Sequence, residues 1–539
     1  MMRSSEHRFR ASARVERAVC AAAALAAVAL HAVFLASAGG LWRDEASLVR
    51  LSTFETIGET WRMLGHESFP ALFPAAVRGW SALGLAGSDH GLRCLGFLVG
   101  LALLGSLWLS AHAYGRALPF VSLALLAANA TVIRWGGSLR GYGLGAALMV
   151  LTAALVWRAV SAPSPRRAAA AAIMGIASVQ CLYQNAFLLA AVCCAGLAVC
   201  ARRGRRGAAL GVLAIGAAAA LSLLPYAGIV AASREWWIVE KRGFDAEVAF
   251  YNLYRALGSP MKWQALAWIG LGGAALARGL ASFRKRGPGE EARSGDLPLF
   301  SALSLALGTI AFVLFLVSAK LPTQPWYWLP LMPFAASCID AALAETLERR
   351  RIPRIVFVAA MVAVPFVPAL KSAAARQTNM DLLAARVAEE AKPGDFVVVY
   401  PWYYGVAFDR YYTGEAPWET LPPLEDSRIH RYDLLKEQLA ADNPIDPVLE
   451  RVGEALATGG RVWIVGGLPP PRAGETAPSD LPPAPGGEHG WSDVPYNFLW
   501  GRTFERFITA RASSVEMIPP ASGLRVSPYE RASLSLALP

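Results

Sequence analysis

The sequence predicts a polytopic α-helical membrane protein that ends in a smaller α/β domain. Of its 539 residues 55% are hydrophobic and only 17% are charged, and the mean hydropathy of +0.38 is too high for an ordinary soluble enzyme. Apolar segments long enough to cross a bilayer recur up to about residue 370 and then stop. We therefore divide the chain into a transmembrane domain, residues 1–370, and a C-terminal domain of ordinary size, residues 371–539.

The formal net charge of +11 raises the question of a nucleic-acid partner. Most of the arginines stand in short tracts between apolar segments rather than on one amphipathic face, so we interpret them as determinants of membrane topology and predict no nucleic-acid binding. The seven cysteines lie in or beside apolar segments, and no Cys or His spacing is typical of a zinc site. We predict neither a metal nor a cofactor.

The first membrane span follows a basic N-terminus. Five arginines precede an apolar stretch at residues 18–38, which has the roughly 20 residues that cross a bilayer. Ala36-Ser37-Ala38 has the small-x-small form of a signal-peptide cleavage site, but the apolar run exceeds the usual hydrophobic region of about 7 to 15 residues. We predict an uncleaved helix that enters the membrane from the cytoplasm.

The stretch from Ser47 to Leu85 mixes apolar and polar residues at helical spacing. Such amphipathic segments lie along a membrane interface instead of crossing it. Pro70 and Pro74 divide the stretch, and we predict two short helices in the first outer loop.

Ten further apolar segments bring the predicted number of transmembrane helices to about eleven. Arginine tracts occupy alternate connections, as expected for loops that remain in the cytoplasm. This alternation predicts a multi-pass membrane protein with a cytoplasmic N-terminus and an extracytoplasmic C-terminal domain. The richness in Ala and Arg indicates a bacterium, so we place the protein in the bacterial inner membrane. The ten segments are at about 92–113, 118–133, 142–160, 168–183, 185–200, 207–230, 262–280, 298–319, 326–345 and 354–370.

The C-terminal domain shows alternating helix and strand patterns. A helix-like stretch at 381–391 leads into Phe396–Tyr400, a continuous apolar run typical of a buried strand, and Arg461–Val465 is a second such run. Strands that alternate with helical stretches predict an α/β domain.

Two adjacent carboxylates, Asp44 and Glu45, follow the first span on its outer side. An isolated acidic residue at this place would mark only the end of the membrane-spanning segment. A like-charge pair, however, raises the pKa of one partner, and such pairs serve general-base chemistry. We predict Asp44 as the catalytic base and Glu45 as a supporting residue.

Several basic and polar residues lie in the other outer loops and are candidates for binding substrate. Arg140 ends a glycine-containing turn, and its guanidinium suits bidentate contact with a phosphate, with Tyr142 nearby. Lys320 is a second candidate phosphate contact; the plain alternatives are an interfacial anchor for Arg140 and a snorkelling side chain for Lys320. The remaining substrate-binding candidates are Arg43, His66, Glu67, Gln324 and Tyr327.

The order of these motifs resembles the membrane glycosyltransferases of the GT-C superfamily, and most closely the protein O-mannosyltransferase and aminoarabinose transferase group. The family often has His-Pro-Pro-Leu where this chain has His66-Glu-Ser-Phe, and a proline at Gly141. The resemblance covers the membrane part of the chain. The motifs that carry it are Trp42–Ala46, His66–Leu72, Ser138–Leu144 and Tyr327–Pro333.

This resemblance implies an inverting transfer of a sugar from a polyprenyl-phosphate donor to an acceptor hydroxyl on a lipid, polysaccharide or protein. At the matching position Asp44 takes the proton from the acceptor, while Arg140 neutralises the leaving phosphate, helped by Lys320 and Tyr327, without a nucleotide or metal. Two alternatives remain open: a transporter that uses Asp44 and Glu45 in an ion or proton pathway, and a non-enzymatic lipid-binding assembly factor.

Overall fold

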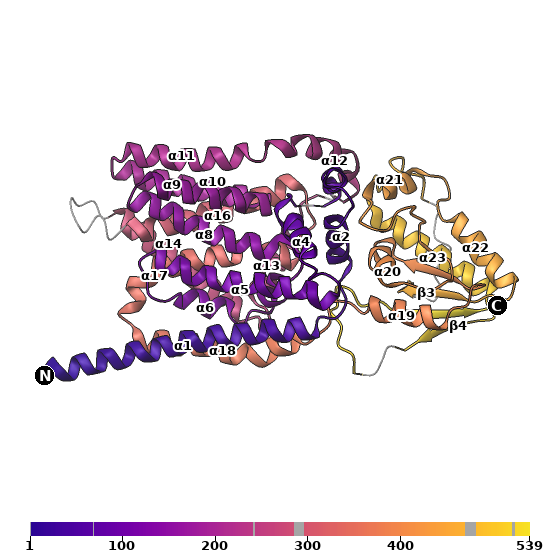
Figure 1. The fold of residues 1–539 in the computed structure, drawn as a ribbon, viewed down its shortest axis with the longest axis horizontal. Coiled ribbons are helices and arrows are strands. Elements are labelled where there is room, and N and C mark those ends of the chain that lie inside the picture. The colour runs from indigo at the N-terminus through magenta and orange to yellow at the C-terminus, as the bar shows by residue number, and fades with distance from the viewer. Residues whose placement is uncertain (1, 68, 241–242, 285–295, 469–480, 520–522) are drawn as a thin grey trace.

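The structure is a computed structural model that describes residues 2–67, 69–240, 243–284, 296–468, 481–519 and 523–539. A bundle of long, roughly parallel helices forms one part of an elongated molecule, and a mixed α/β domain caps one end of the bundle (Figure 1). The N-terminus lies at the opposite end of the bundle. The protein is thus a polytopic helical membrane protein with a C-terminal α/β domain, as the sequence predicted.

Nine helical segments in the described part of the chain are long and apolar enough to cross a membrane. Each presents a mainly apolar surface over at least 18 residues, which suits a hydrocarbon core about 30 Å thick. These segments comprise α1 (Met2–Ser37), α5 (Asp89–Ala113), α8 (Gly141–Ser161), α10 (Asn185–Arg202), α11 (Arg206–Leu221) continuing into α12 (Ala227–Glu240), α14 (Gln264–Arg284), α16 (Asp296–Ala319), η3 (Pro325–Trp328) continuing into α17 (Leu331–Glu348), and α18 (Arg351–Ala373).

Two of the eleven segments predicted from hydropathy differ from this pattern. The segment at 118–133 is two short helices, α6 (Phe120–Leu126) and α7 (Ala130–Gly136), because the Asn129 side chain caps α7 by accepting a hydrogen bond from the Val132 amide, 3.1 Å. The segment at 168–183 is α9 (Pro165–Cys181), whose 17 residues extend about 26 Å. Both segments are apolar and lie in the bundle.

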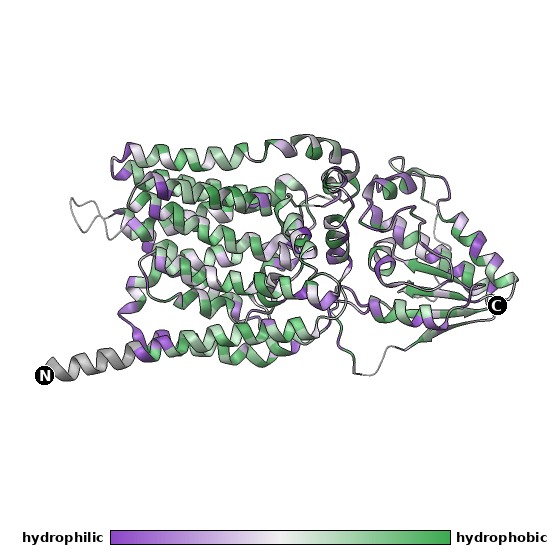
Figure 2. Cartoon of the chain, viewed as in Figure 1, coloured by the Kyte–Doolittle hydropathy of each residue, from purple (hydrophilic) through white to green (hydrophobic). Residues whose placement is uncertain are grey.

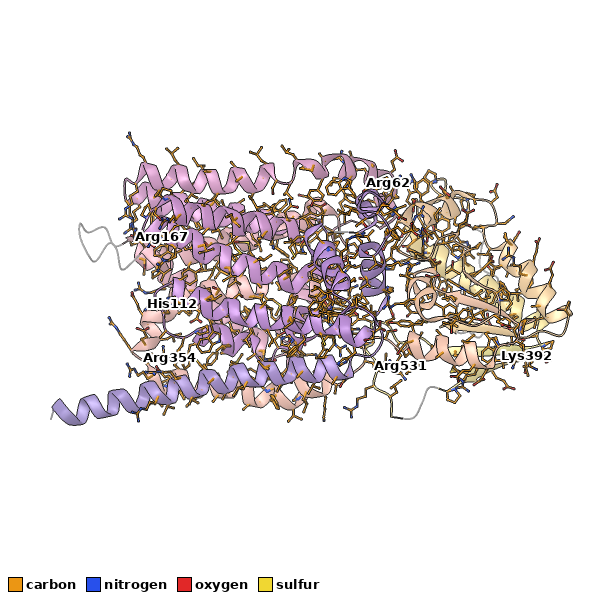
Figure 3. The ribbon with its side chains drawn as sticks, viewed as in Figure 1. Arg62, His112, Arg167, Arg354, Lys392 and Arg531 are labelled. Carbon is orange, nitrogen blue, oxygen red and sulfur yellow. The ribbon has the colours of Figure 1, made fainter. Side chains whose placement is uncertain are left out.

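Polar residues gather at the two ends of the bundle, and apolar residues cover its middle (Figure 2). At the end remote from the α/β domain lie Arg167, Arg354 and His112 (Figure 3). The first two belong to arginine tracts that the sequence placed in cytoplasmic connections. The bundle therefore has one end rich in arginine and another that meets the C-terminal domain.

Three short helices lie across the end of the bundle next to the C-terminal domain: α2 (Arg43–Ser52), α3 (Ile57–Met63) and α4 (Leu72–Ala82) (Figure 1). The sequence predicted two helices here. The third arises because the Thr56 hydroxyl caps α3, accepting from the Glu59 amide at 3.0 Å, and so separates it from α2.

A five-stranded sheet in the order β2-β1-β3-β5-β4 forms the centre of the C-terminal domain. The strands β1 (Phe396–Tyr400), β2 (Trp418–Thr420) and β3 (Val462–Gly466) run parallel, whereas β5 (Leu534–Leu538) is antiparallel to β3 and β4 (Ser514–Ile518). Both predicted strand runs are present, β1 and β3 being buried along their length. The domain's helices are α19 (Met380–Glu390), α20 (Gly405–Tyr411), α21 (Tyr432–Ala440), α22 (Asp446–Ala457) and α23 (Asp493–Arg511).

The C-terminal domain is fastened to the bundle by polar contacts near the start of α2. The Tyr411 hydroxyl accepts a hydrogen bond from the Leu41 amide, 2.6 Å, and Arg410 forms an ion pair with Asp89, 2.6 Å. Helix α18 continues through the predicted domain boundary to Ala373 before the chain enters the domain. These contacts hold the domain directly over the short helices of the first loop.

Candidate active site

A cavity of about 470 Å³ lies at the junction of the helical bundle and the C-terminal domain. Side chains from both parts of the molecule line it. From the bundle come Arg43, Asp44, His66, Glu67, Phe69, Arg140, Tyr142, Gln184, Phe315, Leu316, Leu321, Pro322, Gln324, Trp326 and Tyr327; from the C-terminal domain and the segment that follows α23 come Trp402, Tyr403, His430, Tyr432, Asp493, Pro528 and Tyr529.

Asp44 lies in the first turn of α2 and faces the cavity. The chain leaves α1 at Ser37 and reverses through Gly39, whose φ of +66° favours glycine, before α2 begins at Arg43. A carboxylate in the first turn of a helix is also stabilised by the unpaired amides there. The turn thus delivers Asp44 to the cavity wall, with 24% of its side chain exposed.

Three cationic or ionisable groups surround the Asp44 carboxylate. His430 Nε2 lies 3.4 Å from Oδ1, Arg43 Nε 3.7 Å from Oδ1, and Arg140 Nη2 4.0 Å from Oδ2. Burial alone raises the pKa of a carboxyl group, but these neighbours outweigh it and hold the pKa of Asp44 well below its usual range. Asp44 is therefore an ionised acceptor of hydrogen bonds at neutral pH.

Glu45 points away from the cavity into the bundle. Its side chain is fully buried and forms an ion pair with Arg93 of α5, with 2.6 Å between Oε1 and Nη1. The same oxygen accepts a hydrogen bond from the Leu139 amide, 2.9 Å, and Oε2 lies 3.4 Å from the Trp42 amide nitrogen. Glu45 thereby ties the start of α2 to α5 and to the turn before α8, and it does not line the cavity.

Arg140 reaches the cavity from a tightly packed turn between α7 and α8. A Cβ on Gly143 would lie 2.0 Å from the Gly136 carbonyl oxygen, and one on Gly96 would lie 2.2 Å from that of Gly137, so the glycines allow this turn to pack closely against α5 and α8. From this turn the Arg140 guanidinium packs over the Phe69 ring at 4.3 Å.

The Arg140 guanidinium also connects Asp44 to Glu67. Nη1 donates to the Asp44 backbone carbonyl, 2.9 Å, and to the Glu67 carboxylate, 2.7 Å. The other Glu67 oxygen accepts from the Ser47 hydroxyl, 2.7 Å. Both Glu67 oxygens are therefore engaged, whereas Arg140 Nε is buried without a hydrogen-bond partner among the residues that the structure describes.

Arg43 joins the cavity wall to the segment after α23. Its backbone amide and its guanidinium both donate to the buried Glu530 carboxylate, at 3.0 and 3.2 Å. The guanidinium also packs over the Tyr403 ring, 4.6 Å from the centroid. The Arg43 guanidinium is therefore paired with Glu530 while it also lines the cavity.

His66 is stacked on Trp236 with 4.8 Å between ring centroids, and its Nδ1 is 3.8 Å from Asp433. Burial lowers the pKa of His66 in spite of the Asp433 carboxylate, so the imidazole is neutral at pH 7. Across the described ranges, no group of three or more His, Cys, Asp or Glu side chains is arranged to hold a metal ion.

Comparison with known proteins finds relatives by fold only. No family model and no curated protein matches the sequence. ArnT from Cupriavidus metallidurans in the apo state matches 94% of this chain and 96% of its own, with a TM-score of 0.52 and 13% identity. The oligosaccharyltransferase of Archaeoglobus fulgidus, solved in complex with Zn and sulfate, matches 83% of this chain and 67% of its own, with a TM-score of 0.51 and 13% identity.

The chain shares its fold with ArnT and with this oligosaccharyltransferase. The match to ArnT extends over nearly the whole of both chains, so it includes the C-terminal domain as well as the bundle. The resemblance predicted from the order of the loop motifs is confirmed at the level of the fold.

In this fold, eight of the ten residues singled out from the sequence line the cavity. Glu45 is held by Arg93 behind the cavity wall. Lys320, at the end of α16, is exposed and is not among the lining residues, although the next two residues are. The residues that line the cavity are Arg43, Asp44, His66, Glu67, Arg140, Tyr142, Gln324 and Tyr327.

Some of the lining residues that sequence reasoning missed belong to the bundle, among them Phe69, Gln184 and Trp326, and the others come from the C-terminal part of the chain. Trp402 and Tyr403 follow directly after β1, at the carboxyl end of a parallel strand, where α/β domains commonly place functional side chains. Their position directly after a predicted strand could therefore have identified Trp402 and Tyr403 as candidate site residues. His430, Tyr432 and Asp493 belong to connections and helix starts, and no pattern in the sequence pointed to them.

Proposed function

We propose that the protein is an inverting glycosyltransferase that moves a sugar from a polyprenyl-phosphate donor to an acceptor hydroxyl. The observation that carries the proposal is an ionised, partly exposed carboxylate, Asp44, in a cavity that also holds Arg43 and Arg140. Two of the structural neighbours are an oligosaccharyltransferase and ArnT, an aminoarabinose transferase. Their shared fold supports glycosyl transfer as the general class of reaction.

The apolar side of the cavity supports a lipid-linked donor. Phe315 and Leu316 belong to the membrane helix α16, and they line the cavity together with Leu321 and Pro322. A polyprenyl chain in the bilayer core can therefore lie against α16 while its phosphate reaches the polar part of the cavity.

Two arginines are available for the phosphate. The planar guanidinium forms paired hydrogen bonds with phosphate oxygens. Arg140 and Arg43 both line the cavity. We propose that both arginines stabilise the negative charge that develops on the phosphate as it leaves. Positioned cations stabilise this charge in the transition state more than they stabilise the ground state.

Asp44 is assigned to the acceptor. As the acceptor oxygen attacks the anomeric carbon, its O–H bond breaks and the proton passes to the Asp44 carboxylate. The bond between the anomeric carbon and the phosphate oxygen breaks on the opposite side, and its electron pair leaves with the phosphate. This single displacement inverts the configuration at the anomeric carbon.

We further propose that the reaction takes place on the outer side of a bacterial inner membrane. The arginine-rich end of the bundle, marked by Arg167 and Arg354, lies opposite the cavity (Figure 3). Lys and Arg accumulate in cytoplasmic loops, so this end suits the cytoplasm and the cavity end suits the outside.

Transfer of labelled sugar in proteoliposomes tests the proposal, with a panel of polyprenyl-phosphate hexoses and pentoses as donors and with lipid, polysaccharide and peptide fractions as acceptors. We expect wild-type protein to release polyprenyl phosphate and label one acceptor class. We expect Asp44→Asn to bind the donor but lose transfer.

The outcomes separate the proposed classes. Unchanged sugar transfer by Asp44→Asn contradicts the mechanism. Ion or proton flux that depends on Asp44, without any sugar transfer, indicates a transporter. Lipid binding without turnover in wild-type protein indicates a non-enzymatic assembly factor.

A further inference from the structure

His430 enters the cavity from the C-terminal domain and lies against Asp44 of the bundle. Its side chain is 9% exposed, and its Nε2 is 3.4 Å from Asp44 Oδ1. Neither ring nitrogen of His430 has a hydrogen-bond partner among the described residues. A buried imidazole that lacks any other polar partner and faces a carboxylate calls for an explanation, because buried polar groups are normally paired.

The structure fixes this imidazole from several directions. The His430 backbone amide donates to the Ser47 hydroxyl of α2, 3.3 Å. The ring meets Trp402 edge to face, with 6.0 Å between centroids, and lies 6.1 Å from the Tyr432 ring. His430 is therefore held against α2 by its backbone and oriented by two aromatic rings of its own domain.

The two arginines beside Asp44 do not replace this contact. Arg43 and Arg140 lie 3.7 and 4.0 Å from the carboxylate oxygens, farther away than His430 Nε2 at 3.4 Å. Arg140 is engaged by Glu67, and Arg43 by Glu530. His430 is thus the nearest donor to Asp44 that has no other polar partner in the described chain. Catalytic hydrogen bonds are often long in the absence of substrate and tighten in the reacting complex.

We propose that His430 is a positioning residue for Asp44. Its Nε2–H donates to Oδ1 and fixes the carboxylate, so that Oδ2 faces the acceptor hydroxyl and takes its proton. His430 itself neither gains nor loses a proton in this step. The inference rests on the proposed function, and it makes the C-terminal domain a part of the catalytic machinery in addition to a cover for the cavity.

Two substitutions of similar polarity test the inference. The Gln side chain in His430→Gln can place an amide N–H near the position of Nε2, whereas that of His430→Asn is too short to reach Asp44. His489→Gln is the matched control, because His489 belongs to the same domain and is paired with Glu488 outside the cavity. Each variant is assayed for kcat, for KM of the polyprenyl-phosphate sugar that wild-type protein uses, and for thermal unfolding.

We expect His430→Asn to lower kcat on the order of 10- to 100-fold with an unchanged donor KM, because misplacement of a reacting group by about 1 Å has this effect. His430→Gln should recover most of the loss, and His489→Gln should behave as wild type. Equal kcat values for His430→Asn and His430→Gln overturn the inference, whether both stay near wild type or both fall, because the Nε2 donor then has no separate role.

The same assay separates this inference from the proposed function. If wild-type protein is active, Asp44→Asn is inactive and both His430 variants are fully active, only the positioning role is wrong. If Asp44→Asn is itself active, the proposed mechanism fails and the role of His430 fails with it.

Discussion

Asp44 and Glu45 are neighbours in the first turn of α2, yet they lie in opposite surroundings. Asp44 faces a cavity, keeps 24% of its side chain exposed, and has His430, Arg43 and Arg140 at 3.4 to 4.0 Å. Glu45 is fully buried on the bundle side and is bound to Arg93 at 2.6 Å. One face of α2 is therefore open to a reacting group, and the other face is closed by an ion pair.

On the proposed function, this one short helix carries both the catalytic base and the ion pair that fixes the helix in place. The Glu45 ion pair, together with the hydrogen bond from the Leu139 amide, fixes α2 relative to α5 and to the turn that carries Arg140. Because Glu45 holds the helix in place, the Asp44 carboxylate can change its hydrogen-bond partners. Substitutions on the two faces should accordingly affect different measurements.

The largest expected effect is that of Asp44→Asn on the transfer rate. Loss of a general base lowers kcat by about 10²- to 10⁴-fold, while donor binding through the arginines and the apolar wall remains. Donor binding is measured by native mass spectrometry of the purified variant with the polyprenyl-phosphate sugar that wild-type protein uses. Loss of binding together with activity would assign Asp44 a binding role instead.

The next largest effect is that of Glu45→Gln on stability. Removing one partner of a buried ion pair leaves Arg93 uncompensated, which destabilises a protein by about 3 to 5 kcal/mol. Thermal unfolding in detergent should shift to lower temperature, while the transfer rate per folded molecule stays within a few-fold of wild type. Glu345→Gln is the control, because its carboxylate pairs with Arg278 in a more exposed position. Normal thermal stability combined with a lost transfer rate would instead assign Glu45 a role in the reaction.

Arg140 contacts both Asp44 in the cavity and the buried Glu67. A double substitution separates its proposed role in the reaction from its structural role. Arg140→Ala leaves Glu67 buried without its 2.7 Å partner, so we expect lower stability and a rate reduced by about 10²- to 10³-fold. Adding Glu67→Gln to this variant should restore thermal stability but not the rate. Recovery of both the thermal stability and the transfer rate would show that Arg140 has only a structural role.

The smallest effect is expected for Lys320→Gln. The side chain is exposed and is not among the residues lining the cavity. Transfer rate and donor KM should both change less than about twofold, in line with other exposed charges. A rise in donor KM of tenfold or more would show that Lys320 reaches the phosphate in the working enzyme, as the sequence suggested.

The fold was largely predictable because hydropathy and topology depend on composition along the chain. The apolar segments and the strand runs at Phe396 and Arg461 are local patterns, and each corresponds to an observed helix or strand. The segment at 118–133 is two short helices instead of one because a single capping residue, Asn129, interrupts an otherwise apolar run.

The site was predictable on the bundle side and not on the other. Arg43, Asp44 and Arg140 stand beside spans whose ends are visible in the sequence, so convergence on one end of the bundle followed from topology. His430 lies 386 positions after Asp44 and reaches it only through the docking of the C-terminal domain. The opposite orientations of Asp44 and Glu45 were equally invisible, because Arg93 is a distant partner.

The central claim is that Asp44 alone acts on the reacting atoms, since Glu45 is closed by Arg93 and both oxygens of Glu67 are engaged. Retaining transfer through a glycosyl-enzyme intermediate requires a second carboxylate as nucleophile, whereas a single displacement inverts the anomeric centre. The anomeric configuration of the product, measured by NMR against that of the polyprenyl-phosphate donor, tests this most directly. Inversion is the predicted result, and retention of configuration would contradict the account.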